Sequence, residues 1–439
     1  MKTFRIRDIL ILGFMNFALF VGAGNIIFPP FIGLQAGTSV WPAAAGFLLT
    51  GVGLPVVTAI AMAKAGGSMA VITQPLGRLP GIILTVICYL CIGPLFATPR
   101  TATVSYELAL QPFIGNERGL LPWSLAYFLI VAVISLYPGR LLDTVGKILS
   151  PVKIVALIIL AMTALYLPAG KPQAPVGFYA TAAFSQGVTN GYLTMDTLAA
   201  LVFGLVIVNA IKSRGVSSVK LITRYAIFSG IIAGFGLVLV YLSMFRLGTD
   251  SAELIKNATN GAQVLSTYVN FSYGSSGSLF LGLLITLACM VTAIGLTCAS
   301  ASFFSSITRI SYRVYVWLFV IFSMLVSNLG LTQLIRISAP ALTTIYPVFI
   351  VLVLTYFFRH RFNSPSRMIV PGVILSLLFG ITDVLETIGI TFWPFKLTHY
   401  LPLHNQGLAW VFPSVIVMSL GGLLDKIKGR SHHSLKQEN

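Results

Sequence analysis

Long apolar runs separated by short polar segments dominate this chain and limit what it can fold into. A helix needs about 20 mostly apolar residues to cross the hydrocarbon core of a bilayer, and twelve runs approach or exceed that length. Only 9% of the 439 residues are charged, against about 25% in a soluble domain, so the chain has too few charges to cover a water-facing surface. We therefore predict an all-α polytopic membrane protein with twelve transmembrane helices. They cover residues 9–34, 41–63, 81–108, 120–137, 145–167, 189–211, 219–245, 277–306, 313–329, 337–358, 368–390 and 404–424.

The lysines and arginines between these runs are divided unequally. With the N-terminus in the cytoplasm, the inside segments hold 21 of the 28 basic residues and the outside segments hold 6. Basic residues favour the cytoplasmic side, and a missed run would invert every later segment and remove this asymmetry. We therefore expect both termini in the cytoplasm. Membrane orientation accounts for the net charge of +17, so no nucleic-acid partner is expected.

The first apolar run is interrupted by VGAGNIIFPP, residues 21–30. Unpaired backbone groups are costly in hydrocarbon, so a broken helix persists only beside a cavity, water, an ion or a substrate. Gly22 and Gly24 permit backbone dihedrals closed to other residues and leave the main chain open to a ligand. Freed carbonyls suit Na⁺ or an ammonium group, and the N–H groups of the restarted helix suit a carboxylate. The candidate substrate ligands here are Gly22, Ala23, Gly24 and Asn25. Close helix packing is the alternative role of small residues, and we expect it at Gly13 and Gly33.

The sixth apolar run carries a carboxylate within GYLTMDTLAALVFG, residues 191–204. A carboxylate inside a membrane span is costly and indicates a functional site. Asp196 can hold a cation, accept a proton or cap a restarted half-helix, and Thr194 adds a hydroxyl to the candidate substrate ligands. The segment is weakly similar to GFMNFALFVGAGN, residues 13–25, in the first run.

Two broken helices five runs apart predict a five-plus-five inverted repeat, as found in many transporters. The substrate would then bind near the middle of the bilayer, between the two breaks. The predicted units are a first repeat at 9–167, a second repeat at 189–358, two additional helices at 368–424 and a cytoplasmic tail at 425–439.

The third apolar run contains GPLFATPRTATVSYE, residues 93–107, in which a glycine-proline pair predicts a kink. Arg100 lies inside this run and needs a partner, for which Glu107 and Asp196 are candidates. We expect either a structural ion pair or a role in gating. Tyr106 is a candidate for the substrate carboxylate, with an interfacial position as the alternative.

The eighth apolar run offers two oxygen ligands, the carbonyl of Ala288 and the hydroxyl of Thr292. They lie four residues apart and therefore face the same way on a helix. Such oxygens suit an alkali cation, although hydroxyls in membrane helices also bond to their own backbone. Asp383 and Glu386, in the eleventh run, receive no role.

Several long motifs identify a family that the whole chain resembles. They are ALFVGAGNIIFPP, GPLFATPRTATVSYE, SLYPGRLLDTVGK, NGYLTMDTLAALVFG, VTAIGLTCA and VSNLGL. All are similar to segments of the bacterial branched-chain amino acid carriers, the leucine/isoleucine/valine:cation symporter family. The resemblance implies uptake of leucine, isoleucine and valine with Na⁺ across the bacterial inner membrane.

GAGNIIFP is also distantly similar to the first broken helix of the sodium:neurotransmitter symporters. That resemblance implies a Na⁺ site formed by carbonyls of Ala18 and Val21 with Ala288 and Thr292, and it matches Asn25 to a second Na⁺ position. The sequence departs from the pattern at Val291, where a second hydroxyl is expected.

Other functions remain open at this point. Proton coupling within the same fold is the main alternative to Na⁺ coupling. A channel would need a pore-lining ring, and an intramembrane enzyme would need a catalytic set that the five histidines, at loops, run edges or the tail, do not supply. We expect no enzyme activity, no cofactor or metal beyond Na⁺, no disulfide framework and no obligate protein partner.

Overall fold

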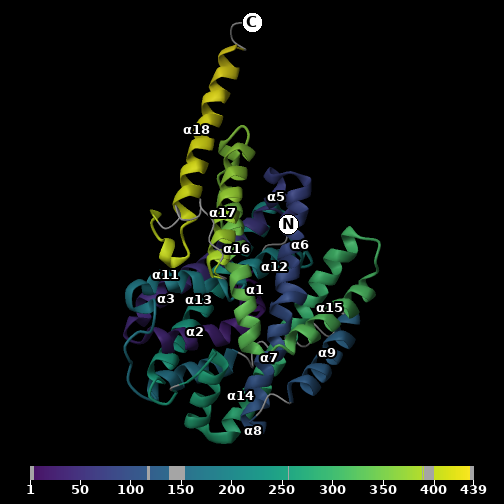
Figure 1. Ribbon diagram of the computed structural model, residues 1–439. Helices are drawn as coiled ribbons and strands as arrows, with labels where there is room; N and C mark the ends of the chain where they lie inside the picture. The colour runs from purple at the N-terminus through teal and green to yellow at the C-terminus, as the bar shows by residue number, and fades with distance from the viewer. Residues whose placement is uncertain are drawn as a thin grey trace.

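The computed structural model describes residues 4–115, 119–137, 154–255, 257–387, 389 and 400–435, and all regular secondary structure in these ranges is helical (Figure 1). The α-helices are α1 (Ile6–Phe20), α2 (Ala23–Ala36), α3 (Val40–Leu48), α4 (Leu54–Lys64), α5 (Met69–Thr73), α6 (Arg78–Leu90), α7 (Ala97–Ala109), α8 (Gln111–Ile114), α9 (Leu120–Leu136), an unlabelled helix Ile154–Tyr166, α11 (Tyr179–Tyr192), α12 (Asp196–Lys212), α13 (Val219–Asp250), α14 (Gly261–Ile307), α15 (Tyr312–Ser327), α16 (Leu331–Tyr356), α17 (Ser366–Thr387) and α18 (Val411–Leu435). Short π turns lie at Leu49–Gly53 and Cys91–Leu95, and 3-10 turns lie at Gly37–Ser39, Gln74–Leu76, Arg359–Arg361 and His404–Gln406.

Six helical stretches in the described ranges are long and apolar enough to cross a membrane, and the bent pair α11 and α12 makes a seventh. The six are Ala23–Lys64, Arg78–Ala109, Val219–Asp250, Gly261–Ile307, Leu331–Tyr356 and Ser366–Glu386. Three shorter apolar helices are α9, α15 and Ile154–Tyr166. The polytopic all-helical class is confirmed, but the count of twelve stays a prediction.

The number of long apolar helices in the described ranges is lower than the twelve predicted spans for identifiable reasons. The first predicted run is divided, because α1 has only 15 residues before its break. Ala23–Lys64 has 42 residues, about twice what a bilayer needs, and a turn at Gly37 (φ 48°) separates its two parts. Parts of the fifth and eleventh predicted runs, at 145–153 and at positions 388 and 390, lie outside the described residues, as do part of SLYPGRLLDTVGK and residues 436–439 of the tail.

Helices that are far apart in sequence pack in pairs. α1 and α2 lie against α13, α3 lies along α11, and α4 lies along α12. In the same way α7 packs along α14, and α9 packs along α15. α17 packs between α16 and α18, and α18 extends away from the helical body in Figure 1.

Small residues allow close approach at these contacts, as the sequence predicted for Gly13 and Gly33. A Cβ on Gly33 would clash with the carbonyl oxygen of Phe245 on α13. A Cβ on Gly13, in α1, would lie 2.6 Å from the side chain of Ile232 on α13. The predicted kink is also present, because Gly93 has non-helical dihedrals (φ −88°, ψ −118°) between α6 and α7.

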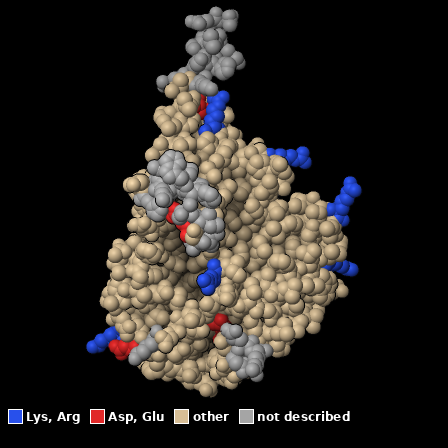
Figure 2. All heavy atoms as spheres, in the orientation of Figure 1, with Lys and Arg blue, Asp and Glu red and all other residues tan. Residues whose placement is uncertain are grey.

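The outer surface is largely apolar. The face in Figure 2 carries scattered lysines and arginines among mostly uncharged side chains. On α15, one stripe of large apolar side chains is exposed, which suits contact with lipid. The exposed residues of this stripe are Val314, Trp317, Leu318, Ile321, Phe322 and Leu325.

Candidate functional site

The first apolar run breaks between α1 and α2, as predicted. Val21 and Gly22 have extended backbone (φ −66°, ψ 92° and φ −113°, ψ −163°), and the helix restarts at Ala23. The side-chain oxygen Oδ1 of Asn25 accepts a hydrogen bond of 2.9 Å from the N–H of Gly22. This bond satisfies one of the backbone donors that the break releases.

One of the two reasons predicted for glycine in this break, its dihedral freedom, is wrong. Gly22 adopts extended dihedrals that any residue tolerates, and Gly24 lies inside α2, so neither position requires a left-handed conformation. Gly24 instead allows close approach to the second break, whereas a Cβ at Gly22 would make only an ordinary contact. A Cβ on Gly22 would lie 3.4 Å from the methyl group of Thr292, and a Cβ on Gly24 would lie 3.3 Å from the backbone of Thr194.

The second break separates α11 from α12, whose axes differ by 41°. Met195 has a left-handed backbone (φ 63°), which is strained for a residue with a side chain. The hydroxyl of Thr194 donates to the carbonyl of Gly191 (2.9 Å) and accepts from the N–H of Asp196 (3.3 Å). Asp196 is the first residue of α12, where its carboxylate complements the positive end of the helix dipole.

The two breaks are in direct contact through a buried polar cluster of Asn25, Asp196 and Tyr241. Asn25 Nδ2 donates to Asp196 Oδ2 at 2.6 Å, and the Tyr241 hydroxyl donates to the same oxygen at 2.9 Å. Asn25 Nδ2 also contacts the Tyr241 hydroxyl. Tyr241, on α13, was missed by sequence reasoning, although a hydroxyl within the apolar run LVLVYLSMF was an available signal.

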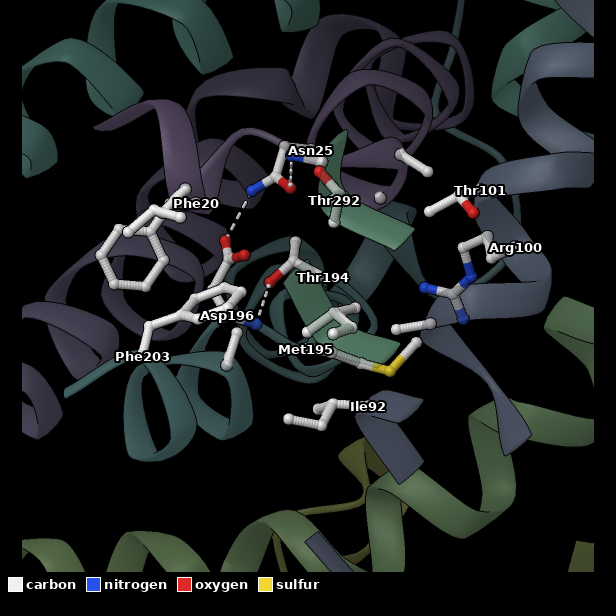
Figure 3. A pocket seen from close by; sticks show the side chains of 17 residues that line it. Phe20, Asn25, Ile92, Arg100, Thr101, Thr194, Met195, Asp196, Phe203 and Thr292 are labelled. Carbon is white, nitrogen blue, oxygen red and sulfur yellow. Dashed lines mark hydrogen bonds between the residues drawn. The ribbon is translucent and has the colours of Figure 1, made fainter. Parts of the chain in front are cut away.

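A cavity lies beside this cluster, between the two breaks, α7 and α14 (Figure 3). Its volume of about 40 Å³ has room for a few water molecules. Apolar side chains, including Phe20, Ile92 and Phe203, form part of its wall, while Asp196 and Arg100 contribute charge. Of the predicted site residues, the cavity brings together Gly22, Ala23, Gly24, Asn25, Arg100, Thr194, Asp196 and Thr292.

Tyr106 does not line this cavity, so its contact with the substrate carboxylate stays a prediction without support from this geometry. Its buried ring lies 6.4 Å from the ring of Trp123, and its hydroxyl lies beside Gly119. The physical reason is the length of α7: Tyr106 is six residues beyond Arg100, about 9 Å along the helix axis.

The residues predicted for Na⁺ lie near the first break. Thr292, on α14, faces Gly22, and its hydroxyl donates to the carbonyl of Ala288 at 3.2 Å. This bond uses the proton of the hydroxyl, so its oxygen keeps lone pairs that can face a cation. Val21 is in the break and Ala18 is one turn earlier on α1. The register of α14 therefore agrees with the prediction, but cation binding stays a prediction.

Arg100 is almost fully buried (1% exposed) and has partners that the sequence did not predict. Its Nη1 donates to the carbonyl of Leu193 at 2.6 Å, and its Nη2 donates to Ser338 Oγ at 2.9 Å. The guanidinium also lies 5.1 Å from the ring centre of Phe28.

The predicted ion pair of Arg100 is therefore wrong, since neither hydrogen-bond partner is a carboxylate. Glu107 is two turns further along α7, about 10 Å away along the axis. Asp196 lies across the cavity and bonds to Asn25 and Tyr241 instead. Arg100 thus joins α7 to the second break and to α16.

Comparison with known proteins agrees with this geometry. A family model described as "Branched-chain amino acid transport protein" matches residues 5–428. The chain is 56% identical over 432 residues to the branched-chain amino acid transport system 3 carrier protein of Pseudomonas aeruginosa, covering 98% of this chain and 99% of the relative.

Solved structures with low sequence identity show the same fold. A closed conformation of Mhp1, a nucleobase-cation-symport-1 family transporter, has a TM-score of 0.61 at 13% identity, covering 96% of this chain and 93% of that one. MhsT in complex with L-phenylalanine has a TM-score of 0.58 at 16% identity, covering 96% of this chain and 99% of that one. The helical architecture is therefore a transporter fold, and the match over nearly the whole sequence shows that the chain belongs to the branched-chain amino acid transport protein family.

Proposed function

We propose that this protein is a secondary transporter that takes up leucine, isoleucine and valine by Na⁺ symport through alternating access. The observation that carries the proposal is the contact between two broken helices at one cavity that holds a buried carboxylate. Family membership and the name of the Pseudomonas relative support the substrate class. The bacterial inner membrane is the proposed location, with both termini in the cytoplasm.

The substrate ammonium group is proposed to bind Asp196. The hydrogen bonds from Asn25 and Tyr241 end on Oδ2, and the Asp196 carboxylate lines the cavity, where a ligand ammonium group can reach it. The first N–H groups of α2, at Ala23 and Gly24, lie beside the same cavity and suit the substrate carboxylate. Phe20 and Phe203 provide apolar surface for an aliphatic side chain.

The coupling ion is proposed to be Na⁺. Its ligands would be the carbonyls of Ala18, Val21 and Ala288 with the hydroxyl of Thr292, and Asn25 would serve a second ion. The position of Thr292 against Gly22 supports the first site. Proton coupling through Asp196 is the alternative, because a buried carboxylate can also carry a proton.

The inverted repeat is proposed at 9–167 and 189–358, followed by two additional helices, for twelve spans in all. Helix pairing supports it. In such a repeat, the contact of the first span with the seventh is equivalent to that of the sixth with the second. Both contacts occur, as α1 and α2 with α13 and as α11 and α12 with α3 and α4. Rocking of one helix bundle against the other would then expose the cavity to each side in turn.

Uptake of radiolabelled leucine into proteoliposomes tests the function and the ion. We expect uptake with an inward Na⁺ gradient, competition by isoleucine and valine, and a raised Na⁺ concentration for half-maximal uptake in Thr292→Val. Uptake driven equally by a proton gradient without Na⁺ would contradict Na⁺ symport. Absence of leucine uptake under both gradients would contradict the transport proposal itself.

A further inference from the structure

Arg100 has more binding capacity than its contacts in the protein use. It lines the cavity and is 1% exposed, and a guanidinium stays charged at neutral pH. A carbonyl, a hydroxyl and an aromatic ring surround it, with no carboxylate ion pair in the described part of the chain. A buried charge without a counter-charge is costly. An anion that the protein does not itself supply would therefore stabilise this charge.

The guanidinium also has a donor to spare. Its Nε is buried and has no hydrogen-bond partner among the described residues. The N–H donors of a guanidinium match the two oxygens of a carboxylate in geometry. A carboxylate is therefore among the strongest partners of an arginine side chain. An anionic ligand could satisfy both the charge and the donor at once.

The other charged wall of the cavity is Asp196. Figure 3 shows Asp196 and Arg100 on different sides of the same cavity, with Thr194 and Met195 between them. A free amino acid carries an ammonium group and a carboxylate on one carbon. The cavity therefore presents one charged partner for each of these groups.

We propose that Arg100, together with the N–H groups of Ala23 and Gly24, binds the α-carboxylate of the substrate and makes the site selective for free amino acids over analogues without that group. This inference rests on the proposed amino acid transport at the same cavity. Because Nη1 of Arg100 holds the carbonyl of Leu193, the substrate carboxylate would also contact the group that tethers the second break to α7.

Direct binding of two ligands to purified protein in nanodiscs tests the inference. The ligands are leucine and leucinol, and leucinol has an alcohol in place of the carboxylate. We expect wild-type protein to bind leucine at least about 30-fold more tightly than leucinol, the effect of losing one partner of a buried charge pair. Arg100→Gln should weaken leucine binding by a similar factor and change leucinol binding by less than about 3-fold. The preference for leucine should therefore collapse.

A matched control is Arg359→Gln. Arg359 donates to a carbonyl, that of Val71, at 2.7 Å and lies 4.3 Å from the ring centre of Tyr356, so it has the same kinds of neutral partners away from the cavity. We expect this variant to keep the wild-type preference. The reciprocal ligand, 4-methylpentanoate, lacks the ammonium group and should lose binding in Arg100→Gln but not in Asp196→Asn.

Three results would separate the possibilities. Equal weakening of leucine and leucinol by Arg100→Gln would overturn the inference and assign Arg100 a structural or gating role. Equal binding of the two ligands to wild-type protein would overturn it without any variant, even if Arg100→Gln does not fold. Failure of wild-type protein to bind leucine at all would instead contradict the proposed function.

Discussion

The two helix breaks meet at one cavity but are built differently. The first break is neutral, has unstrained extended backbone, and is capped by the amide of Asn25. The second break has no glycine between Leu193 and Asp196, contains the left-handed Met195, and ends in a buried carboxylate. The difference indicates that the first break provides a preformed backbone surface, whereas the second provides charge at the cost of strain.

The second break also depends more on other helices. Arg100 holds the carbonyl of Leu193, and Asn25 and Tyr241 hold the carboxylate of Asp196. These contacts come from α7, α2 and α13, so the strained segment is fixed from several directions. We infer that changes at the second break alter transport most, while changes at the first act on its own ligand contacts and through its contact with the second.

The largest effect is expected for Asp196→Asn. This change keeps the shape of the side chain but removes the buried negative charge proposed to hold the ammonium group. We expect leucine uptake to fall at least about 30-fold in proteoliposomes. Asp250→Asn is the control, because Asp250 is also a buried aspartate but pairs with Arg246 outside the cavity. Wild-type uptake by Asp196→Asn would contradict the role of this charge.

Asn25→Ala sharpens the comparison because it affects both breaks at once. The substitution removes the cap on Gly22 and a donor to Asp196. A hydrogen bond to a charged group contributes about 1.5–3 kcal/mol, so we expect leucine binding to weaken about 10- to 100-fold. Tyr241→Phe removes only one donor to the same carboxylate and should have the smaller effect in the same binding assay. A larger loss of leucine binding in Tyr241→Phe than in Asn25→Ala would contradict this arrangement of the three side chains.

The two glycines of the first break should differ in their response to alanine. The added methyl group at Gly24 would press on the backbone of Thr194, which cannot turn aside as a side chain can. At Gly22 it would meet a side-chain methyl group at an ordinary contact distance. We expect Gly24→Ala to weaken leucine binding about tenfold and Gly22→Ala to weaken it less than threefold. Equal effects would contradict close approach to Thr194 as the reason for glycine at position 24.

Met195→Gly should have the smallest effect and concerns stability. A left-handed conformation costs a residue with a side chain about 1–2 kcal/mol. Glycine avoids this strain but loses about 0.5–1 kcal/mol more backbone entropy on folding, which offsets part of the gain. Because Met195 is buried, both Met195→Ala and Met195→Gly lose its packing, and only glycine also relieves the left-handed backbone. We expect the thermal midpoint of the purified Met195→Gly variant to be equal to or a few degrees above that of Met195→Ala. A clearly lower midpoint for Met195→Gly than for Met195→Ala would mean that the left-handed backbone is not strained.

The sequence predicted the features that break a rule of membrane helices. Glycines and Asn25 in the first run, and Asp196 in the sixth, each conflict with an uninterrupted apolar helix, so both breaks were found from local pattern alone. The partners of these residues were not predictable in the same way. Tyr241 and Leu193 join the site through tertiary contacts, which no local pattern encodes.

Two candidate residues lie away from the cavity for the same physical reason. Glu107 was one of two candidate partners for Arg100, and Tyr106 was a candidate for the substrate carboxylate with an interfacial position as the alternative. Each lies about two turns along α7 from the residues that face the cavity, and the helix rise carries both away from it. Proximity within a motif is thus a weak guide to shared sites when the motif spans several helical turns.

The most direct test is a cryo-electron microscopy map of the protein in nanodiscs with saturating leucine and Na⁺. We predict ligand density between the restarts of α2 and α12, within hydrogen-bond distance of both Asp196 and the N–H groups at Ala23 and Gly24. Leucine bound away from the two breaks, or both helices continuous through the bilayer, would contradict the account.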